Sequence, residues 1–372
     1  MKKTTIAIAT LLGTMVGAGI LGIPYMVKQS GFTIGLIHLI LIGLIITITM
    51  LYLGEIILRT KSTHHVTGYA AKYLGKKGKS IMFLSTALGI YAALLAYLLG
   101  EGESWSQLFT GTSHYSLVFS LAFWGIFAGI TYFGISALKK GETWGVLAII
   151  TLLLILSIQF IPQIQKENLE YTNVKNIFVP FGVILFAYLA FSAMPEVRNI
   201  LRHQEKSMKK VIILAHVIVF VIYILFTILV LGSQGQATPQ LATLGLGKTF
   251  ILLGVLTMFT SYLALASAIT DTLYFDFQMH RKKAWIITSI LPLCLLMLIQ
   301  FTKNTSFTTV LSVGGVISGG LTAILILFMV RKAKVIGNRK PEYQIPCPSW
   351  LMVLLILVFT SGAIVEIVRI LK

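Results

Sequence analysis

The chain has 372 residues, of which 56% are hydrophobic and 11% are charged, and its mean hydropathy is +0.89. Soluble domains carry about 25% charged residues, so this composition excludes a water-soluble fold and indicates an integral membrane protein. The net charge is +18, but Lys and Arg lie between the long apolar runs, so the charge does not indicate a nucleic-acid partner. Two cysteines are too few for a disulfide framework or a zinc site.

Eleven apolar runs are long enough to cross a bilayer, which takes about 20 residues in a helix. Backbone groups in lipid must hydrogen-bond within their own segment, so these runs are predicted to be α-helices. The first run follows a basic start but has no small-residue cleavage site at its end, which favours an uncleaved helix over a signal peptide. The predicted spans are 4–27, 32–58, 80–110, 114–136, 143–161, 177–197, 211–233, 249–279, 285–302, 305–330 and 347–368.

The basic residues predict the orientation of these spans. Of the 30 Lys and Arg residues, 23 fall on one side of the membrane. By the positive-inside rule that side is cytoplasmic, which places the N-terminus inside and the C-terminus outside a plasma membrane. The remaining seven fall on the other side: Lys28, Lys166, Lys175, Lys248, Lys303, Arg369 and Lys372.

Two similar segments indicate an internal repeat. Pro24 ends a Gly-rich stretch in the first span, and Pro195 stands 171 residues later in the sixth, each five residues after a small residue (Gly19 and Ala190). The same offset maps the later spans onto one another, so residues 4–161 and 177–330 are predicted to be two copies of a five-helix unit. Because five is odd, the second copy must be inverted in the membrane. The last span, 347–368, is an addition to a single transmembrane domain over 1–372. Interrupted first helices in two inverted halves are typical of secondary transporters.

The stretch GTMVGAGILGIPYMVKQSGF, residues 13–32, resembles the first helix of the hydroxy and aromatic amino acid permeases, within the amino acid–polyamine–organocation superfamily. FAYLAFSAMPEV, residues 186–197, is similar to their interrupted sixth helix. The resemblance implies an all-α fold of the leucine-transporter type, with eleven helices in a 5+5 inverted repeat plus one. It covers essentially the whole chain.

A break near Gly13–Gly17 would begin the outer half-helix with unpaired N–H groups and a positive dipole, which suit a carboxylate. The resemblance implies the same arrangement, with an amino-acid carboxylate on the amides of Gly17, Ala18 and Gly19. The substrate ammonium would then meet carbonyls of Thr14, Met15 and the unwound segment near Phe186. Close packing of helices at the glycines is the alternative. Aromatic and small residues predicted to surround the substrate are Tyr97, Phe186, Tyr188, Ala190 and Phe191.

A stripe of small and hydroxyl residues on the eighth span indicates a cation site. Thr257, Thr260 and Ser261 share one helical face with Asp271 further along. By resemblance, Gly13, Val16 and Thr257 would give carbonyls, and Thr260 and Ser261 hydroxyls, to a sodium ion. Some relatives couple to protons through a lysine on the fifth helix, and 143–161 contains no lysine, which favours sodium. Ordinary helix packing is the alternative.

Four acidic residues are candidates for proton or gate roles. Glu101 and Glu103 lie in the outer half of the third span, where they serve either as a vestibule proton or cation acceptor or as a solvated helix end. Glu196 and Asp271 lie near cytoplasmic helix ends together with Glu55, where they form either gate ion pairs or plain interface charges.

The sequence therefore predicts a secondary active transporter for a neutral amino acid, with aromatic and hydroxylated amino acids among the candidates, driven by sodium or protons. A membrane receptor that senses amino acids through the same fold is the alternative. No spacing of His, Asp, Cys or Glu suits catalysis, so an enzyme is not expected, nor is a cofactor or metal beyond a coupling Na⁺ or H⁺. The expected partners are the amino acid and the bilayer, and the sequence does not predict the oligomeric state.

Overall fold

The computed structural model describes residues 2–133, 150–151, 153–155, 158–302 and 306–371. These residues form helices joined by short loops. The elements are α1 (Lys3–Met15), α2 (Ala18–Ser30), α3 (Phe32–Leu58), α4 (Val66–Thr110), α5 (Ser116–Phe133), η1 (Ile161–Gln163), α7 (Glu167–Glu170), η2 (Val174–Asn176), α8 (Phe181–Tyr188), η3 (Phe191–Ala193), α9 (Met194–Ile200), η4 (Glu205–Ser207), α10 (Met208–Gln234), η5 (Gly235–Ala237), η6 (Ala242–Leu246), α11 (Lys248–Asp271), η7 (Thr272–Asp276), α12 (Arg281–Thr302), α13 (Phe307–Val313), η8 (Gly314–Gly319), α14 (Gly320–Ile336) and α15 (Ser349–Leu371).

The predicted spans coincide with helices wherever the structure describes them. Within the described ranges, 9 helices or helix runs are long and apolar enough to cross a membrane, and the bent pair α1 and α2 makes a tenth. The predicted span 143–161 lies largely outside the described residues, so the count of eleven stays a prediction. The third span is longer than predicted, because α4 begins at Val66 and bends at Gly75, where φ is +74°.

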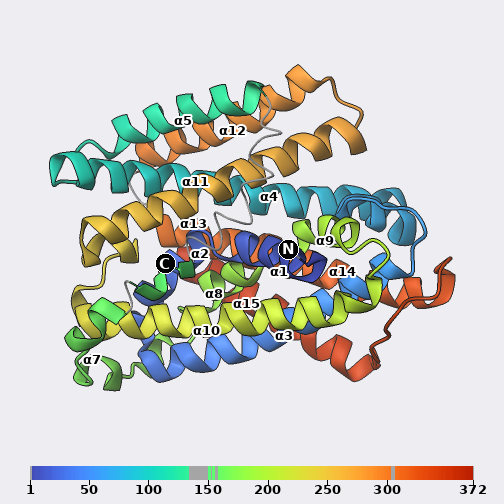
Figure 1. The fold of residues 1–372 in the computed structure, drawn as a ribbon, viewed down its shortest axis with the longest axis horizontal. Helices are drawn as coiled ribbons and strands as arrows, with labels where there is room; N and C mark the ends of the chain where they lie inside the picture. Colours follow the sequence, from blue (N-terminus) through green and yellow to red (C-terminus); the bar gives the residue numbers. More distant parts are fainter. Residues whose placement is uncertain (1, 134–149, 152, 156–157, 303–305, 372) are drawn as a thin grey trace.

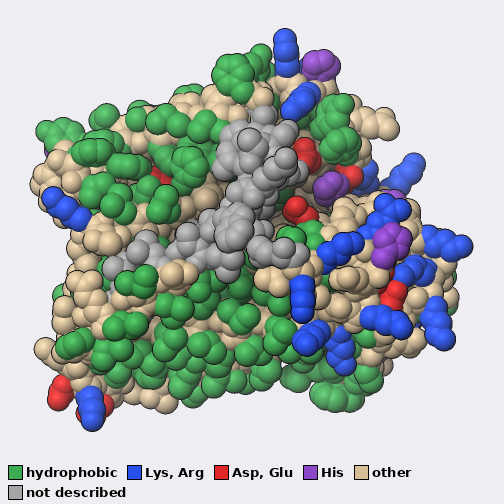
Figure 2. All heavy atoms as spheres, in the orientation of Figure 1, with side chains coloured by type: hydrophobic (Ala, Val, Ile, Leu, Met, Phe, Trp, Pro, Cys, Tyr) green, Lys and Arg blue, Asp and Glu red, His purple; other side chains and the backbone are tan. Residues whose placement is uncertain are grey.

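The broken helices lie in the middle of the molecule. In Figure 1, α4, α5, α11 and α12 form one layer and α3 and α10 another, with α1, α2, α8 and α13 between them. Exposed leucines, isoleucines and phenylalanines cover the long sides, as expected for a surface in contact with lipid. Figure 2 shows Lys and Arg gathered mainly at one end of the long axis. We call this the basic end; it contains the α3–α4 and α14–α15 loops. The chain is a multi-pass membrane protein.

Both helices that the sequence predicts to be interrupted are interrupted. The first breaks at Val16 and Gly17, where ψ is 74° and −141°, and its halves α1 and α2 meet at 52°. The second breaks at Leu189 and Ala190, between α8 and η3. A β-carbon on Gly19 would lie 2.6 Å from Ala187 Cα, so a glycine is required for the two broken helices to approach each other at this point.

Candidate substrate and ion site

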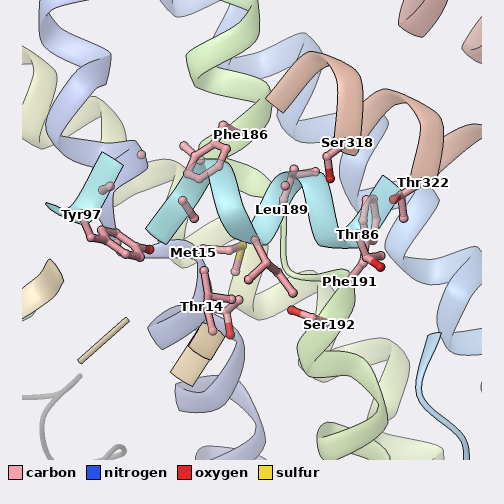
Figure 3. Close-up of a pocket in the computed structure, with 18 residues that line it drawn as sticks. Thr14, Met15, Thr86, Tyr97, Phe186, Leu189, Phe191, Ser192, Ser318 and Thr322 are labelled. Atoms are coloured by element: carbon pink, nitrogen blue, oxygen red, sulfur yellow. The ribbon is translucent and has the colours of Figure 1, made fainter. Parts of the chain in front are cut away.

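A pocket lies at the two helix breaks. The space between atoms there is about 640 Å³, a volume that includes open solvent. Figure 3 shows Tyr97 at one end and Thr86, Phe191 and Thr322 towards the other. The start of α4 is at the basic end (Figure 1), and Thr86 lies nearer to that start than Tyr97 does. The pocket therefore extends from the breaks towards the basic end.

Eight of the ten predicted substrate residues line this pocket, and they are Thr14, Met15, Gly17, Ala18, Gly19, Tyr97, Phe186 and Phe191. The other two, Tyr188 and Ala190, do not. The Tyr188 side chain is fully buried and its hydroxyl donates to the Leu39 carbonyl on α3, at 3.2 Å. Ala190 is buried at the break itself. Tyr188 turns away because its ring packs parallel to His216, with centroids 6.4 Å apart.

The start of α2 forms the end of the pocket that suits an anion. Gly17 is the residue before α2, and Ala18 and Gly19 are in the first turn of that helix. No side chain caps the start of α2. The Gly17 N–H donates to the Met15 carbonyl, so the helix dipole and the N–H groups of the first turn of α2 are what suits a carboxylate here. A β-carbon on Gly17 would lie 2.8 Å from the Tyr97 hydroxyl and 3.0 Å from Ser261 Oγ, so two hydroxyls face this backbone.

Two carbonyl groups near the breaks share one donor. The Tyr223 hydroxyl, on α10, lies 2.7 Å from the Met15 oxygen and 2.7 Å from the Ala187 oxygen. Met15 and Ala187 both line the pocket.

Only some of the residues predicted to bind the ion lie close together in the structure. Ser261 Oγ is buried beside Gly17 with the Tyr97 hydroxyl as its polar neighbour, and it makes no hydrogen bond of standard geometry in the described part of the chain. Thr260 is half-buried, and its hydroxyl donates to the Leu256 and Thr257 carbonyls of its own helix. The Thr257 hydroxyl likewise donates within α11. Val16 is buried at the break and Gly13 is half-buried one turn before it.

The four predicted acidic residues have different surroundings. Glu101 is fully buried, and neither carboxylate oxygen has a partner within the described residues. Glu103 and Asp271 are half-buried and Glu196 is exposed. None of these four is in an ion pair among the described residues.

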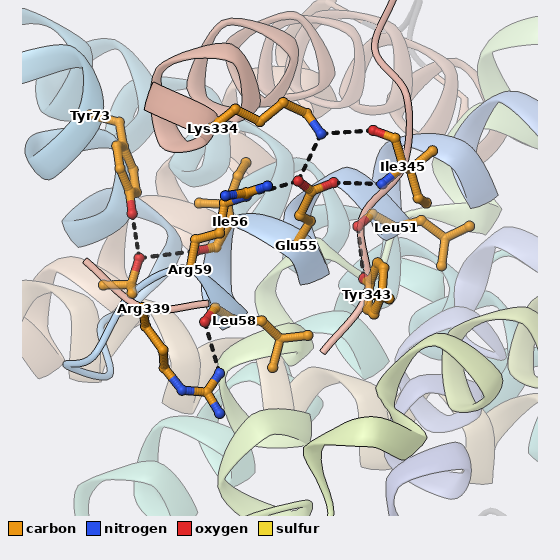
Figure 4. A network of polar contacts seen from close by, with 11 residues as sticks. Leu51, Glu55, Ile56, Leu58, Arg59, Tyr73, Lys334, Arg339, Tyr343 and Ile345 are labelled. Carbon is orange, nitrogen blue, oxygen red and sulfur yellow. Dashed lines mark hydrogen bonds and ion pairs between the residues drawn. The ribbon is translucent and has the colours of Figure 1, made fainter. Parts of the chain in front are cut away.

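Glu55 instead forms the gate-like contact at the basic end. Its buried carboxylate accepts from Arg59 Nε at 2.8 Å, Lys334 Nζ at 2.7 Å and the Ile345 N–H at 2.9 Å (Figure 4). These bonds hold the α14–α15 loop across the end of α3. Nearby, the Arg198 guanidinium of α9 donates to the Thr60, Lys61 and Ser62 carbonyls and the Tyr69 hydroxyl.

The outer end of α2 is tied to two loops. Lys28 Nζ donates to the Gln236 and Thr238 carbonyls, at 3.2 and 2.9 Å. The Asn173 N–H donates to the Ser30 carbonyl at 2.8 Å. These contacts lie on the side of the breaks away from the basic end.

Sequence reasoning missed several lining residues: Thr86, Gly89, Ile90, Ala93, Ala187, Leu189, Ser192, Leu265, Ser318 and Thr322. The spacing of Thr86, Gly89, Ala93 and Tyr97 on one face of α4 is a signal that could have revealed part of this wall. No spacing signal links Tyr223 to the breaks, because it lies 208 residues from Met15.

The structure resembles the crystal structure of MhsT in complex with L-phenylalanine, with a TM-score of 0.74, 14% identity and coverage of 98% of this chain and 97% of that chain. This likeness shows a leucine-transporter-type fold.

Two relatives are transport proteins. Glutamine transporter 2 of Aliivibrio fischeri is 24% identical over 354 residues, which cover 90% of this chain and 89% of the relative. Tyrosine-specific transport system 1 of Haemophilus influenzae is 25% identical over 245 residues, which cover 64% of this chain and 60% of the relative. Both are transporters, which confirms that the chain is not an enzyme. Residues 1–243 match the tryptophan/tyrosine permease family, to which the chain therefore belongs.

Proposed function

We propose that the chain is a secondary active transporter that takes up a neutral amino acid, aromatic or hydroxylated, by alternating access. The pocket at the two breaks carries this proposal, because it brings a helix N-terminus and two peptide carbonyls together. An amino acid presents one carboxylate and one ammonium group, which these partners match. The relatives named for tyrosine and for glutamine support an amino-acid substrate.

The coupling ion in this proposal is sodium, with protons as the alternative. The Ser261 hydroxyl beside the first break, which makes no hydrogen bond of standard geometry in the described part of the chain, supports sodium, since hydroxyl and carbonyl oxygens are ligands of hard cations. Residues 4–161 and 177–330 would form the inverted repeats, and the basic end would face the cytoplasm of a plasma membrane. The hydrogen bonds of Lys28 at the outer end, and a pocket that extends towards the basic end, suit a conformation of the transporter that is closed to the outside.

Uptake into vesicles tests the proposal. Purified protein in liposomes is offered a panel of labelled amino acids under a sodium gradient, a pH gradient or no gradient. We expect saturable uptake of a neutral amino acid that needs the sodium gradient. Specific binding without uptake under any gradient would support the sensing receptor instead.

A further inference from the structure

The Tyr223 hydroxyl connects the two broken helices at the level of the pocket. Its partners, the Met15 and Ala187 carbonyls, belong to helix ends 172 residues apart, and both contacts are 2.7 Å long. Tyr223 itself is fully buried, and its ring packs edge-on against Tyr188, with centroids 5.2 Å apart. The packing of the ring therefore holds the hydroxyl between the two carbonyls.

The donors in the chain do not fill all the lone pairs of the two carbonyls. A phenol has one proton, so one carbonyl accepts it fully or both share it. The Met15 oxygen also accepts from the Gly17 N–H at 3.0 Å. The Ala187 oxygen has no backbone donor in the described part of the chain, because the helix is interrupted two residues later, so the Tyr223 hydroxyl is its donor there. A carbonyl oxygen has two lone pairs, so the Ala187 oxygen can accept a second hydrogen bond from a ligand with a donor group.

We infer that Tyr223 is a positioning residue for the substrate ammonium, an inference that rests on the proposed function. Its hydroxyl holds the Met15 and Ala187 oxygens at a fixed separation and leaves one lone pair of the Ala187 oxygen open. The ammonium group of an amino acid has three N–H donors and can fill that lone pair from the pocket side. Tyr223 thus acts through the two carbonyls and touches no substrate atom.

The test compares Tyr223→Phe with wild type against two ligands, the transported amino acid and its deaminated acid, used as a competitor. The variant keeps the ring and loses only the hydroxyl. We expect its affinity for the amino acid to fall about tenfold, while that for the deaminated acid changes less than twofold, since the lost hydroxyl acts only on the ammonium side. A general loosening of the fold would weaken both ligands alike, and that result overturns the inference. Unchanged affinity for the amino acid overturns it too.

Tyr52→Phe is the matched control. Tyr52 is also fully buried, and its hydroxyl donates to one carbonyl, that of Pro346, at 2.8 Å. We expect less than a twofold change for either ligand. If Tyr223→Phe does not fold, wild type alone still decides: a deaminated acid that competes as well as the amino acid contradicts any ammonium site at these carbonyls. Absence of amino-acid uptake by wild type would instead contradict the proposed function.

Discussion

Ser261 on α11 lies directly against Gly17 at the first helix break, with its Oγ 3.0 Å from the position of a β-carbon on that glycine. The Tyr97 hydroxyl is on the same side, 2.8 Å from that position. The proposed ion ligand, the proposed carboxylate site and the wall of the pocket therefore meet at one backbone position. A change at any of these three residues is expected to affect transport.

Gly17→Ala tests the carboxylate site. The added methyl group would meet the Tyr97 hydroxyl and Ser261 Oγ closer than normal contact allows, so the break must shift and its amides lose their alignment. We expect at least a tenfold loss of uptake efficiency at unchanged expression, measured as initial rates in liposomes. Gly125→Ala on α5 is the control, because its methyl group would meet nothing within 4 Å. Equal uptake by Gly17→Ala and wild type would contradict the site.

Ser261→Ala and Thr260→Ala test the ion. Each substitution removes one hydroxyl oxygen that would replace a water molecule in the hydration shell of a sodium ion. Because the Ser261 hydroxyl makes no hydrogen bond of standard geometry among the described residues and the Thr260 hydroxyl is bonded within its helix, we expect the larger effect from Ser261→Ala. The sodium concentration for half-maximal uptake should rise several-fold for Ser261→Ala and less for Thr260→Ala, with substrate preference unchanged.

Ser233→Ala on α10 is the control for this pair, since that hydroxyl donates only within its own helix. If uptake follows a pH gradient in sodium-free buffer, and neither α11 variant changes that uptake, the coupling ion is the proton. Glu101 would then be the next residue to replace, because its buried carboxyl group has no partner within the described residues.

Lys28→Met tests the closure of the outer end. The change removes the donors to Gln236 and Thr238, so α2 is released from the loop after α10 and the outward-open state gains population. The substitution Ala93→Cys, made after both native cysteines are replaced, places one thiol in the pocket. The rate at which this thiol is labelled measures how accessible the pocket is. We expect a membrane-impermeant thiol reagent added outside to label it several-fold faster. Lys248→Met, at an exposed lysine, should leave the labelling rate unchanged.

Glu55→Gln tests the ion pairs at the basic end. The amide of glutamine carries no charge, and one of the two oxygens that accept from Arg59, Lys334 and the Ile345 N–H becomes an NH2 donor. Because Arg59 and Lys334 are partly exposed, we expect a cost of about 2 kcal/mol, less than for a fully buried pair. The melting temperature in detergent is expected to fall by a few degrees. Glu170→Gln, at an exposed residue outside any ion pair in the described chain, should melt like wild type. Identical melting of Glu55→Gln would show that these bonds do not stabilise the loop.

The sequence by itself determined the membrane class, the positions of the described spans and the places where two helices break. These properties are local: a run of about 20 apolar residues must become a helix in lipid, and glycine and proline act on the backbone within a turn. Eight of the predicted substrate residues line the pocket for the same reason, since they flank the breaks or lie on α4 facing them.

Only the tertiary structure decided which distant side chains reach those breaks. Tyr223 lies on the predicted seventh span, and nothing in its spacing distinguishes it from other buried aromatic residues; its rotation towards Met15 and Ala187 depends on how α10 packs against both broken helices. Tyr188, beside the second break, faces α3 and His216 instead of the pocket. The direction of a side chain depends on the neighbours available to a helix face, and those neighbours come from elsewhere in the chain.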